Sequence, residues 1–131
     1  MPNQKHILLI DDDIKFSIGM VAILKREGYK VTNSRNGTEG LESIRTQKPD
    51  LILCDVMMPV PDGMEVKAEI NKDEQLKNIP FMFISAKTSQ TDKDRARLLG
   101  VTDYILKPFV VSEVLEKVNG ILGQDESSFA A

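Results

Sequence analysis

The sequence predicts an α/β fold in which a parallel sheet is covered by helices on both faces. Short apolar runs alternate along the chain with longer segments whose apolar residues recur at helical spacing. This alternation implies right-handed crossover connections, which place successive strands parallel to one another. The runs Ile7–Ile10 and Leu51–Cys54 are apolar throughout, as is typical of strands buried on both faces. We therefore predict five strands that alternate with five helices.

The predicted strands are short, and polar or turn-forming residues bound them. They cover Ile7–Ile10, Lys30–Ser34, Leu51–Cys54, Phe81–Ser85 and Asp103–Leu106. The first helix ends at Gly28. Its apolar stripe consists of Ile14, Ile18, Val21 and Leu24. Leu41 and Ile44 mark a shorter second helix.

The later helices are marked with unequal strength. Met64–Asn71 predicts the third helix, and the polar segment Lys72–Pro80 is expected to be a surface loop. Ala96 marks the fourth helix, which stops at Gly100, a residue type favoured just beyond a helix. The fifth helix has the clearest period, carried by Val111, Val114, Leu115, Val118, Ile121 and Leu122.

Composition is that of a single globular domain. The chain has 131 residues, enough for one sizeable core. We expect the domain to span residues 1–123, followed by a short flexible tail at 124–131. The net charge of −3 disfavours a general nucleic-acid surface, and the lone cysteine, Cys54, is expected to be a small buried hydrophobe. Neither a signal peptide nor a membrane helix is predicted, so we expect a cytoplasmic protein.

Five polar residues follow four of the predicted strands. Asp11 and Asp12 follow the first strand, Asp55 the third, Ser85 ends the fourth, and Lys107 follows the fifth. In parallel sheets of this kind, ligands bind at the carboxyl ends of the strands. Clustered carboxylates repel one another unless a cation joins them, so the pattern predicts a divalent metal site with an anion beside the lysine.

A simpler interpretation of each residue is a helix cap or a turn. Asp and Ser often cap the helix after a strand, and for Asp13 we favour this role over metal ligation. The joint placement of five polar groups after four apolar strands is much harder to obtain by chance. We therefore prefer a shared site to five separate caps.

The chain resembles the receiver domain of two-component response regulators from about His6 to Leu122. The matching residues are Asp11-Asp12, the pattern D-x-x-M-P-x-x-D-G that begins at Asp55, then Ser85-Ala86 and Lys107-Pro108-Phe109. One of these motifs alone would be weak, but all four in order are specific. The resemblance implies a flavodoxin-like (βα)5 fold with strand order 2-1-3-4-5.

The resemblance also implies a role for each polar residue. Asp55 would accept a phosphoryl group. Asp12, Asp55 and the backbone carbonyl of Met57 would hold Mg²⁺ directly, and Asp11 would act mainly through water. The Ser85 hydroxyl would bond a phosphoryl oxygen. Lys107 would pair with Asp55 or its phosphate. Mg²⁺ does favour oxygen ligands that include one or two carboxylates, retained waters and a phosphate, and carboxylates are known covalent phosphoryl acceptors.

A switch is the expected consequence of phosphorylation. Tyr104 stands where the family has a switch aromatic, so a shift of the Ser85 hydroxyl would let Tyr104 turn inward. The surface around Ala96, Tyr104 and Val114 would then change. Expected partners are a histidine kinase or histidine phosphotransfer protein and a downstream effector protein or domain. A homodimer through the same surface is possible, and neither direct nucleic-acid binding nor membrane binding is expected.

The lifetime of the phosphorylated form depends on two further positions. Met57 and Lys87 would flank the path of a water that attacks the aspartyl phosphate. Met57 has no group to orient that water, so we expect slow self-dephosphorylation. Lys87 could stabilise the transition state, but we favour crowding of the path, because hydrolysis needs a positioned water as well as neutralised charge.

Three other functions are weighed against the receiver hypothesis. A Mg²⁺-dependent phosphatase of the haloacid dehalogenase type also uses an aspartate at a strand end, but Asp11-Asp12-Asp13-Ile14-Lys15 lacks the hydroxyl or valine expected there. A degenerate receiver that binds partners without phosphorylation is disfavoured by the intact key positions. A flavin-binding flavodoxin would need a hydroxyl- and glycine-rich phosphate loop after the first strand. We therefore predict a regulatory phospho-acceptor, either stand-alone or part of a longer protein.

Overall fold

The structure is a computed structural model, and it describes residues 4–86 and 89–123. Within these residues, five strands alternate with five helices. In chain order they are β1 (His6–Ile10), α1 (Ile14–Arg26), β2 (Lys30–Ser34), α2 (Gly37–Gln47), β3 (Leu51–Asp55), α3 (Gly63–Ile70), β4 (Phe81–Ser85), α4 (Gln90–Leu98), β5 (Tyr104–Leu106) and α5 (Val111–Leu122). The predicted alternation is thereby confirmed.

All neighbouring strands run parallel, in the order β2-β1-β3-β4-β5. The order reverses at β1, because the chain first adds β2 on one side and then β3 on the other. A parallel sheet has its ligand sites outside the strand ends near such a reversal. The register pairs Ile10 with Cys54 and Asp55 with Ile84, so the ends of β1, β3 and β4 reach the same edge of the sheet.

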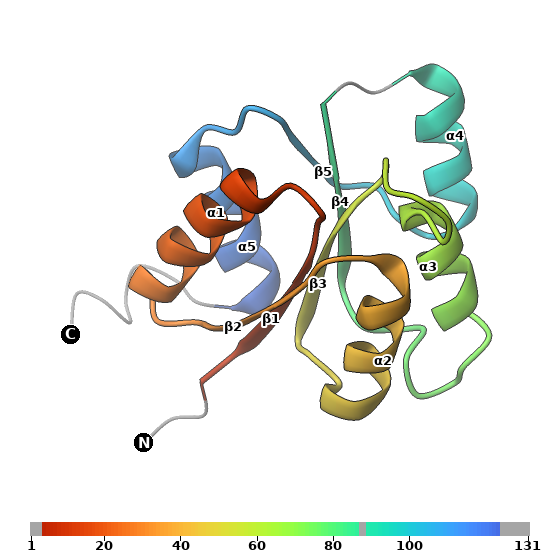
Figure 1. Cartoon of the computed structure of the whole chain (residues 1–131), viewed down its shortest axis with the longest axis horizontal. Coiled ribbons are helices and arrows are strands. Elements are labelled where there is room, and N and C mark those ends of the chain that lie inside the picture. The colour runs from red at the N-terminus through yellow and green to blue at the C-terminus, as the bar shows by residue number, and fades with distance from the viewer. Residues whose placement is uncertain (1–3, 87–88, 124–131) are drawn as a thin grey trace.

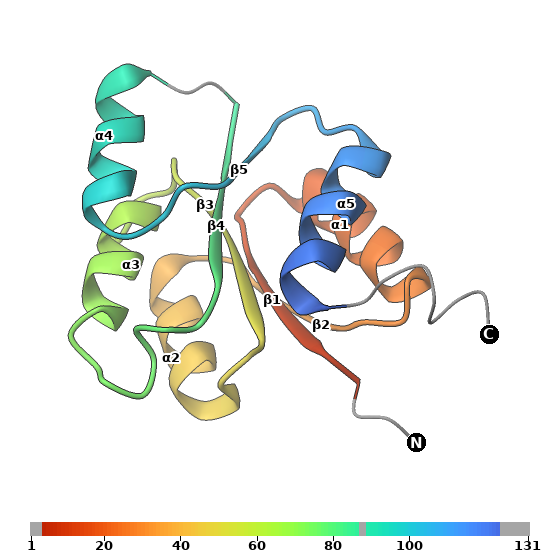
Figure 2. The ribbon, with the colours of Figure 1, turned by 180° about the vertical axis from the view of Figure 1, so that it is seen from behind.

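The sheet separates two helical layers. Helices α1 and α5 cover one face, and α2, α3 and α4 cover the other (Figures 1 and 2). Alternate residues of β1 serve the two layers: Ile7 and Leu9 join the core beneath α1 and α5, whereas Leu8 and Ile10 join the core on the other side. Burial on both faces explains why the central strands are apolar throughout.

The apolar stripe predicted for α1 is wrong in its first half. Ile14 and Ile18 are 59% and 67% exposed. The buried face of α1 consists of Ser17, Met20 and Leu24. Apolar residues surround most of this helix, so helical spacing alone does not decide which side packs on the sheet. Packing selects a face rotated away from the predicted stripe.

Smaller differences concern the ends of elements. The first strand begins at His6, β3 includes Asp55, and the fifth strand begins at Tyr104. Helix α3 covers Gly63–Ile70, one residue earlier at each end than predicted. Cys54 is fully buried, as predicted, and the expected tail at 124–131 lies outside the described residues.

Gly63 lets the start of α3 approach the end of β3 closely. A Cβ atom on Gly63 would lie 2.4 Å from the carbonyl oxygen of Asp55 and 2.9 Å from Cα of Val56. Both obstacles are backbone atoms, so they cannot move aside as a flexible side chain would. Only glycine therefore permits this packing of α3 beneath the loop that leaves β3.

We predict that Gly63→Ala destabilises the protein by about 1–3 kcal/mol or more, because the added methyl group overpacks a rigid backbone. Gly120→Ala is the matched control, since nothing lies within 4 Å of its added Cβ. In helix α5 that control should stabilise the protein by about 0.5–1 kcal/mol. Urea denaturation measures both changes, and equal stability of the two variants would contradict the close approach at Gly63.

Candidate functional site

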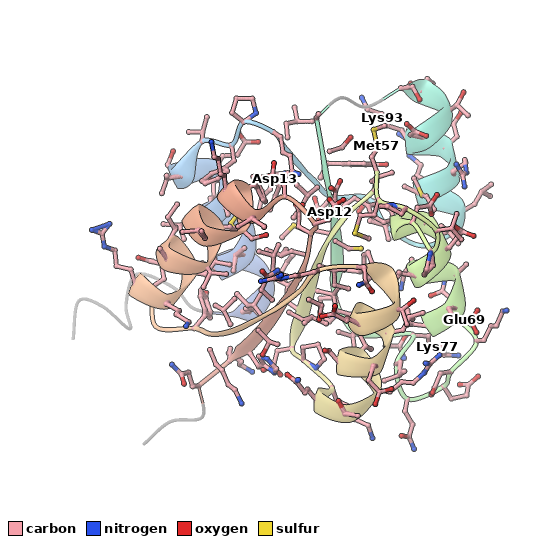
Figure 3. The ribbon with its side chains drawn as sticks, in the orientation of Figure 1. Asp12, Asp13, Met57, Glu69, Lys77 and Lys93 are labelled. Atoms are coloured by element: carbon pink, nitrogen blue, oxygen red, sulfur yellow. The ribbon has the colours of Figure 1, made fainter. Side chains whose placement is uncertain are left out.

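Three consecutive aspartates connect β1 to α1, and each has a different environment. Asp11 is buried and extends the sheet, because its N–H donates to the carbonyl of Ser34 at 3.0 Å. Asp13 caps α1 as predicted: its carboxylate accepts from the N–H of Phe16 at 3.1 Å. The N–H of Asp13 in turn donates to Oδ1 of Asp11 at 2.8 Å. Asp12 is exposed at the end of β1, next to Asp13 (Figure 3).

Asp55 is the last residue of β3 and is buried. The strand continues its pairing just past this point, where the N–H of Val56 donates to the carbonyl of Ile84 at 3.0 Å. The chain then turns, and the N–H of Met57 donates back to Oδ1 of Asp55 at 3.1 Å. The Met57 side chain points outward and is 67% exposed (Figure 3). A backbone N–H therefore holds the Asp55 carboxylate at the edge of the sheet.

Lys107 follows β5 and reaches across to both buried carboxylates. Its backbone N–H donates to the carbonyl of Ser85 at 2.8 Å, which fixes the start of the side chain beside β4. Its Nζ lies 2.9 Å from Oδ2 of Asp11 and 3.4 Å from Oδ2 of Asp55. The same Nζ lies 4.5 Å from the centroid of the Phe16 ring. The ammonium is thus enclosed by two carboxylates and an aromatic face.

The charges of this cluster do not balance. Burial, together with the negative charge of Asp11, raises the pKa of Asp55 to about 6, although the Met57 N–H and Lys107 act in the opposite direction. For Lys107, burial works to lower the pKa, but close interactions with the carboxylates of Asp11 and Asp55 raise it overall. The lysine therefore stays protonated. One ammonium does not fully compensate the clustered carboxylates, and a further cation would favour the ionised form of Asp55.

The donor set of this cluster fits a hard divalent cation. Carboxylate oxygens of Asp11, Asp12 and Asp55 lie within 4.8 Å of one another. Among the described residues, Oδ2 of Asp11 has the ammonium of Lys107 beside it but accepts no hydrogen bond of good geometry. Oxygen ligands from carboxylates, completed by water, are those that Mg²⁺ prefers. The residues therefore match the predicted metal.

The predicted switch pair lies on neighbouring strands. Ser85 is buried at the end of β4. Its register partner on β5 is Leu106, whereas Tyr104 pairs with Phe83 two residues earlier. The Tyr104 ring packs against Phe83 at 5.9 Å between centroids, and its hydroxyl donates to the carbonyl of Asp92 in α4 at 3.2 Å. Tyr104 thus connects β5 to α4.

Comparison with known proteins identifies the family. The model of the response regulator receiver domain matches residues 7–119. The chain belongs to the receiver domain family of response regulators. It is a phospho-accepting switch of the CheY type. The predicted family and the flavodoxin-like fold with strand order 2-1-3-4-5 are thereby confirmed.

Curated relatives include proteins of two sizes. The receiver is 37% identical over 122 residues to the alkaline phosphatase synthesis transcriptional regulatory protein PhoP of Bacillus subtilis, covering 93% of this chain and 50% of PhoP. It is 31% identical over 117 residues to protein PilH of Pseudomonas aeruginosa, covering 89% of this chain and 97% of PilH. The chain therefore spans half of one relative and nearly all of the other.

Solved structures agree with the fold. The receiver superposes on the chemotaxis protein CheY4 of Vibrio cholerae with a TM-score of 0.86 and 27% identity, covering 91% of this chain and 99% of CheY4. The receiver domain of the sensor histidine kinase PA1611 of Pseudomonas aeruginosa gives a TM-score of 0.84 and 30% identity, with 92% of this chain and 99% of that chain covered. That structure has a magnesium ion coordinated in its active-site cleft.

Four of the five predicted strand-end residues form one cluster, and an unpredicted aromatic residue lies beside it. Asp11, Asp12, Asp55 and Lys107 converge as expected, and Ser85 ends the adjacent strand. Phe16, which faces the ammonium of Lys107, was not anticipated, because its position depends on the rotation of α1. Lys87, which we expected near the site, lies outside the described residues. Within the residues described, no helix has the length and apolar character needed to cross a membrane.

We predict that Asp55→Asn stabilises the metal-free receiver at pH 7–8 and has no such effect near pH 4. The raised pKa of Asp55 means that the folded protein keeps a proton that the unfolded chain loses between the ordinary value of 3.8 and about 6. Stability should therefore fall as pH rises through this window and stay lower above it. Asparagine removes that cost, by about 1–2 kcal/mol after allowance for water at the pocket.

Unfolding free energies in a chelator, measured from pH 4 to 8, test this expectation. Asp103→Asn is the control, because Asp103 is a half-exposed partner of Lys117 at 4.0 Å and its loss should change stability by less than about 0.5 kcal/mol. A parallel pH profile for wild type and Asp55→Asn would show that Asp55 ionises without cost in the fold.

Proposed function

We propose that Asp55 is the residue that accepts the phosphoryl group. What carries the proposal is its position between an ammonium at 3.4 Å, a backbone N–H at 3.1 Å and the other two carboxylates of the cluster. Asp11 is less suited to meet a donor, because its side chain has no exposed surface, whereas the side chain of Asp55 is 7% exposed. Asp12 is exposed at the mouth of the cluster.

Metal binding would prepare the acidic cluster for an anionic donor. We propose Asp12, Asp55 and the carbonyl of Met57 as direct ligands of Mg²⁺, with Asp11 acting through water. When bound, Mg²⁺ supplies positive charge that offsets the repulsion between carboxylate and phosphate. Asp55 then presents one carboxylate oxygen to phosphorus. As that O–P bond forms, the bond between phosphorus and its donor breaks.

Two further residues would hold the transferred group. Lys107 carries a compact positive charge on a flexible stem, so a movement of its Nζ from Asp11 toward Asp55 would bring it to a phosphoryl oxygen. Ser85 ends β4, and the N–H of Lys107 donates to its carbonyl, so this hydrogen bond fixes the backbones of the two residues relative to each other. The Ser85 hydroxyl would donate to a second phosphoryl oxygen.

Receiver domains interact with histidine kinases and effectors, and we propose both kinds of partner for this chain. A histidine kinase or histidine phosphotransfer protein would donate the phosphoryl group. The output would use the surface of α4, β5 and α5, where Leu106, Val110 and Val111 are exposed apolar residues. A downstream effector or a second copy of the chain would bind there. We propose residues 1–123 as the unit that switches, with a regulatory rather than a hydrolytic role.

We predict that acetyl phosphate with Mg²⁺ phosphorylates wild-type protein at Asp55 alone. Asp55→Asn should lose the label because its amide is not a nucleophile. Asp12→Ala should keep its fold but label far more slowly, since it loses a metal ligand. Asp103→Asn, remote from the cluster, is the control and should label like wild type. Peptide mapping locates the phosphate, and full labelling of Asp55→Asn would refute the assignment.

We predict that phosphorylation perturbs α4 and β5 around Tyr104. The Tyr104 hydroxyl donates to the carbonyl of Asp92, so an inward turn of its ring would break a bond between β5 and α4. Amide chemical shifts with and without beryllofluoride measure this change. Tyr104→Phe is the control, because it keeps the ring without that bond. Shift changes confined to the residues around Asp55 would argue against the switch.

We predict that Met57→Asn shortens the lifetime of the phosphorylated form. The amide can orient a water for attack on phosphorus, and one hydrogen bond contributes about 1 kcal/mol, so decay should accelerate about fivefold. Met57→Leu is the matched control, because it keeps an apolar side chain and should leave decay unchanged. Loss of label over time at saturating Mg²⁺ is the measurement. Equal decay of Met57→Asn and Met57→Leu would show that Met57 does not limit water.

A further inference from the structure

The ammonium of Lys107 lies over the face of the Phe16 ring, 4.5 Å from its centroid. Among the described residues, the other contact of this type joins Lys67 to Phe81 at 5.5 Å, on the far side of the sheet. A cation placed within about 6 Å of an aromatic face is attracted by the negative charge there. Phe16 therefore acts on the Lys107 ammonium of the acidic cluster.

The ammonium of Lys107 stays inside the acidic cluster only if contacts there outweigh its tendency to turn toward water. Its stem has four carbons, and its charged end normally turns toward water. Here the side chain of Lys107 is only 17% exposed, and its Nζ has two carboxylates at unequal distances, 2.9 Å and 3.4 Å. The ring closes a third side of the ammonium. Since an aromatic face attracts the charge without competing for a strong hydrogen bond, the N–H donors remain directed at oxygen atoms.

The ring itself is fixed from two directions. The Phe109 ring, two residues beyond Lys107, meets it edge to face, with centroids 5.4 Å apart and planes at 88°. The backbone of Phe16 is fixed by Asp13, whose carboxylate accepts its N–H, while the N–H of Asp13 binds the Asp11 carboxylate. The ring, its cap and the acidic cluster thus form one connected unit.

We propose that Phe16 is a positioning residue that holds the Lys107 ammonium within reach of the phosphoryl group on Asp55. The proposal rests on the function proposed above for Asp55 and Lys107. The ring keeps the ammonium close to Asp55 while Asp11 competes for it. When the phosphoryl group arrives, Nζ leaves its ion pair with Asp11, donates a hydrogen bond to a phosphoryl oxygen and keeps its contact with the ring.

Apolar packing alone is the alternative explanation for Phe16. Both Phe16 and Phe109 pack against the core beneath α1 and α5, so any large apolar residue would satisfy that role. The two explanations differ in chemistry. Packing depends on the volume of the side chain, whereas attraction of the ammonium depends on the electron density of the ring.

The test compares the rate at which acetyl phosphate labels Asp55 at saturating Mg²⁺. Phe16→Leu keeps an apolar side chain. Trifluorinated phenylalanine at position 16 keeps the shape of the ring but lowers the electron density on its face. Both should label about three- to tenfold more slowly, the range expected for a partly desolvated cation–π contact. Phe16→Tyr should label like wild type. Trifluorinated phenylalanine at position 81 is the matched control and should leave the rate unchanged.

A second measurement needs neither metal nor phosphate. Unfolding of the metal-free protein is followed for Phe16→Leu, Lys107→Met and the double variant. If the ring contacts the ammonium, the two single effects on the unfolding free energy do not add in the double variant. Either single substitution already removes the contact, so the second cannot remove it again. Phe109→Leu paired with Lys107→Met is the control and should show a smaller coupling than the pair with Phe16.

The outcomes separate this inference from the proposed function. Wild-type rates in Phe16→Leu and in the fluorinated protein, together with additive stability effects, would overturn the role of Phe16 even if Asp55 carries the phosphate. Absence of label at Asp55 in wild type would instead refute the proposed function. Coupling between Phe16 and Lys107 in the metal-free protein would still report the contact between ring and ammonium.

Discussion

The site depends on the repulsion between two buried carboxylates that share one ammonium. Asp11 and Asp55 come from adjacent strands, and Lys107 lies close to both. Burial withdraws water from these charges and, together with repulsion by Asp11, raises the pKa of Asp55 to about 6. In the protein alone, ionisation of Asp55 therefore costs folding free energy. A metal and then a phosphoryl group each change the charge that Lys107 must balance.

The fold supplies this arrangement through strand ends and backbone contacts. The strand order reverses at β1, so Asp11, which follows β1, lies between the ends of β2 and β3. Gly63 lets α3 begin directly beneath the turn after Asp55. This turn directs the N–H of Met57 at the Asp55 carboxylate. Rigid backbone therefore fixes the carboxylates, while the longest and most flexible side chain of the site, that of Lys107, can respond to the bound group.

The sequence predicts the order of elements and the cluster at the sheet edge, because both depend on local signals. These signals are the helical spacing of apolar residues, the apolar runs of the strands and the polar residues at strand ends. Asp13 could be recognised as a cap on the same basis. The rotation of α1 was not predictable: Ile14, Phe16, Ile18 and Met20 make several faces of the helix apolar, and only packing against the sheet selects one. The register that offsets Tyr104 from Ser85 likewise depends on pairing between β4 and β5 rather than on spacing in the chain.

The rotation of α1 has a direct consequence for the site. Residues two apart on a helix lie on nearly opposite sides, so a rotation that buried Ile14 and Ile18 would turn Phe16 away from β5. The observed rotation instead exposes both isoleucines and brings the Phe16 ring to Lys107. Exposure of two large apolar residues costs the fold some hydrophobic burial. The same rotation brings an aromatic face of α1 to the site. The rotation of α1 about its axis therefore determines both the packing of this helix and the position of the Lys107 ammonium.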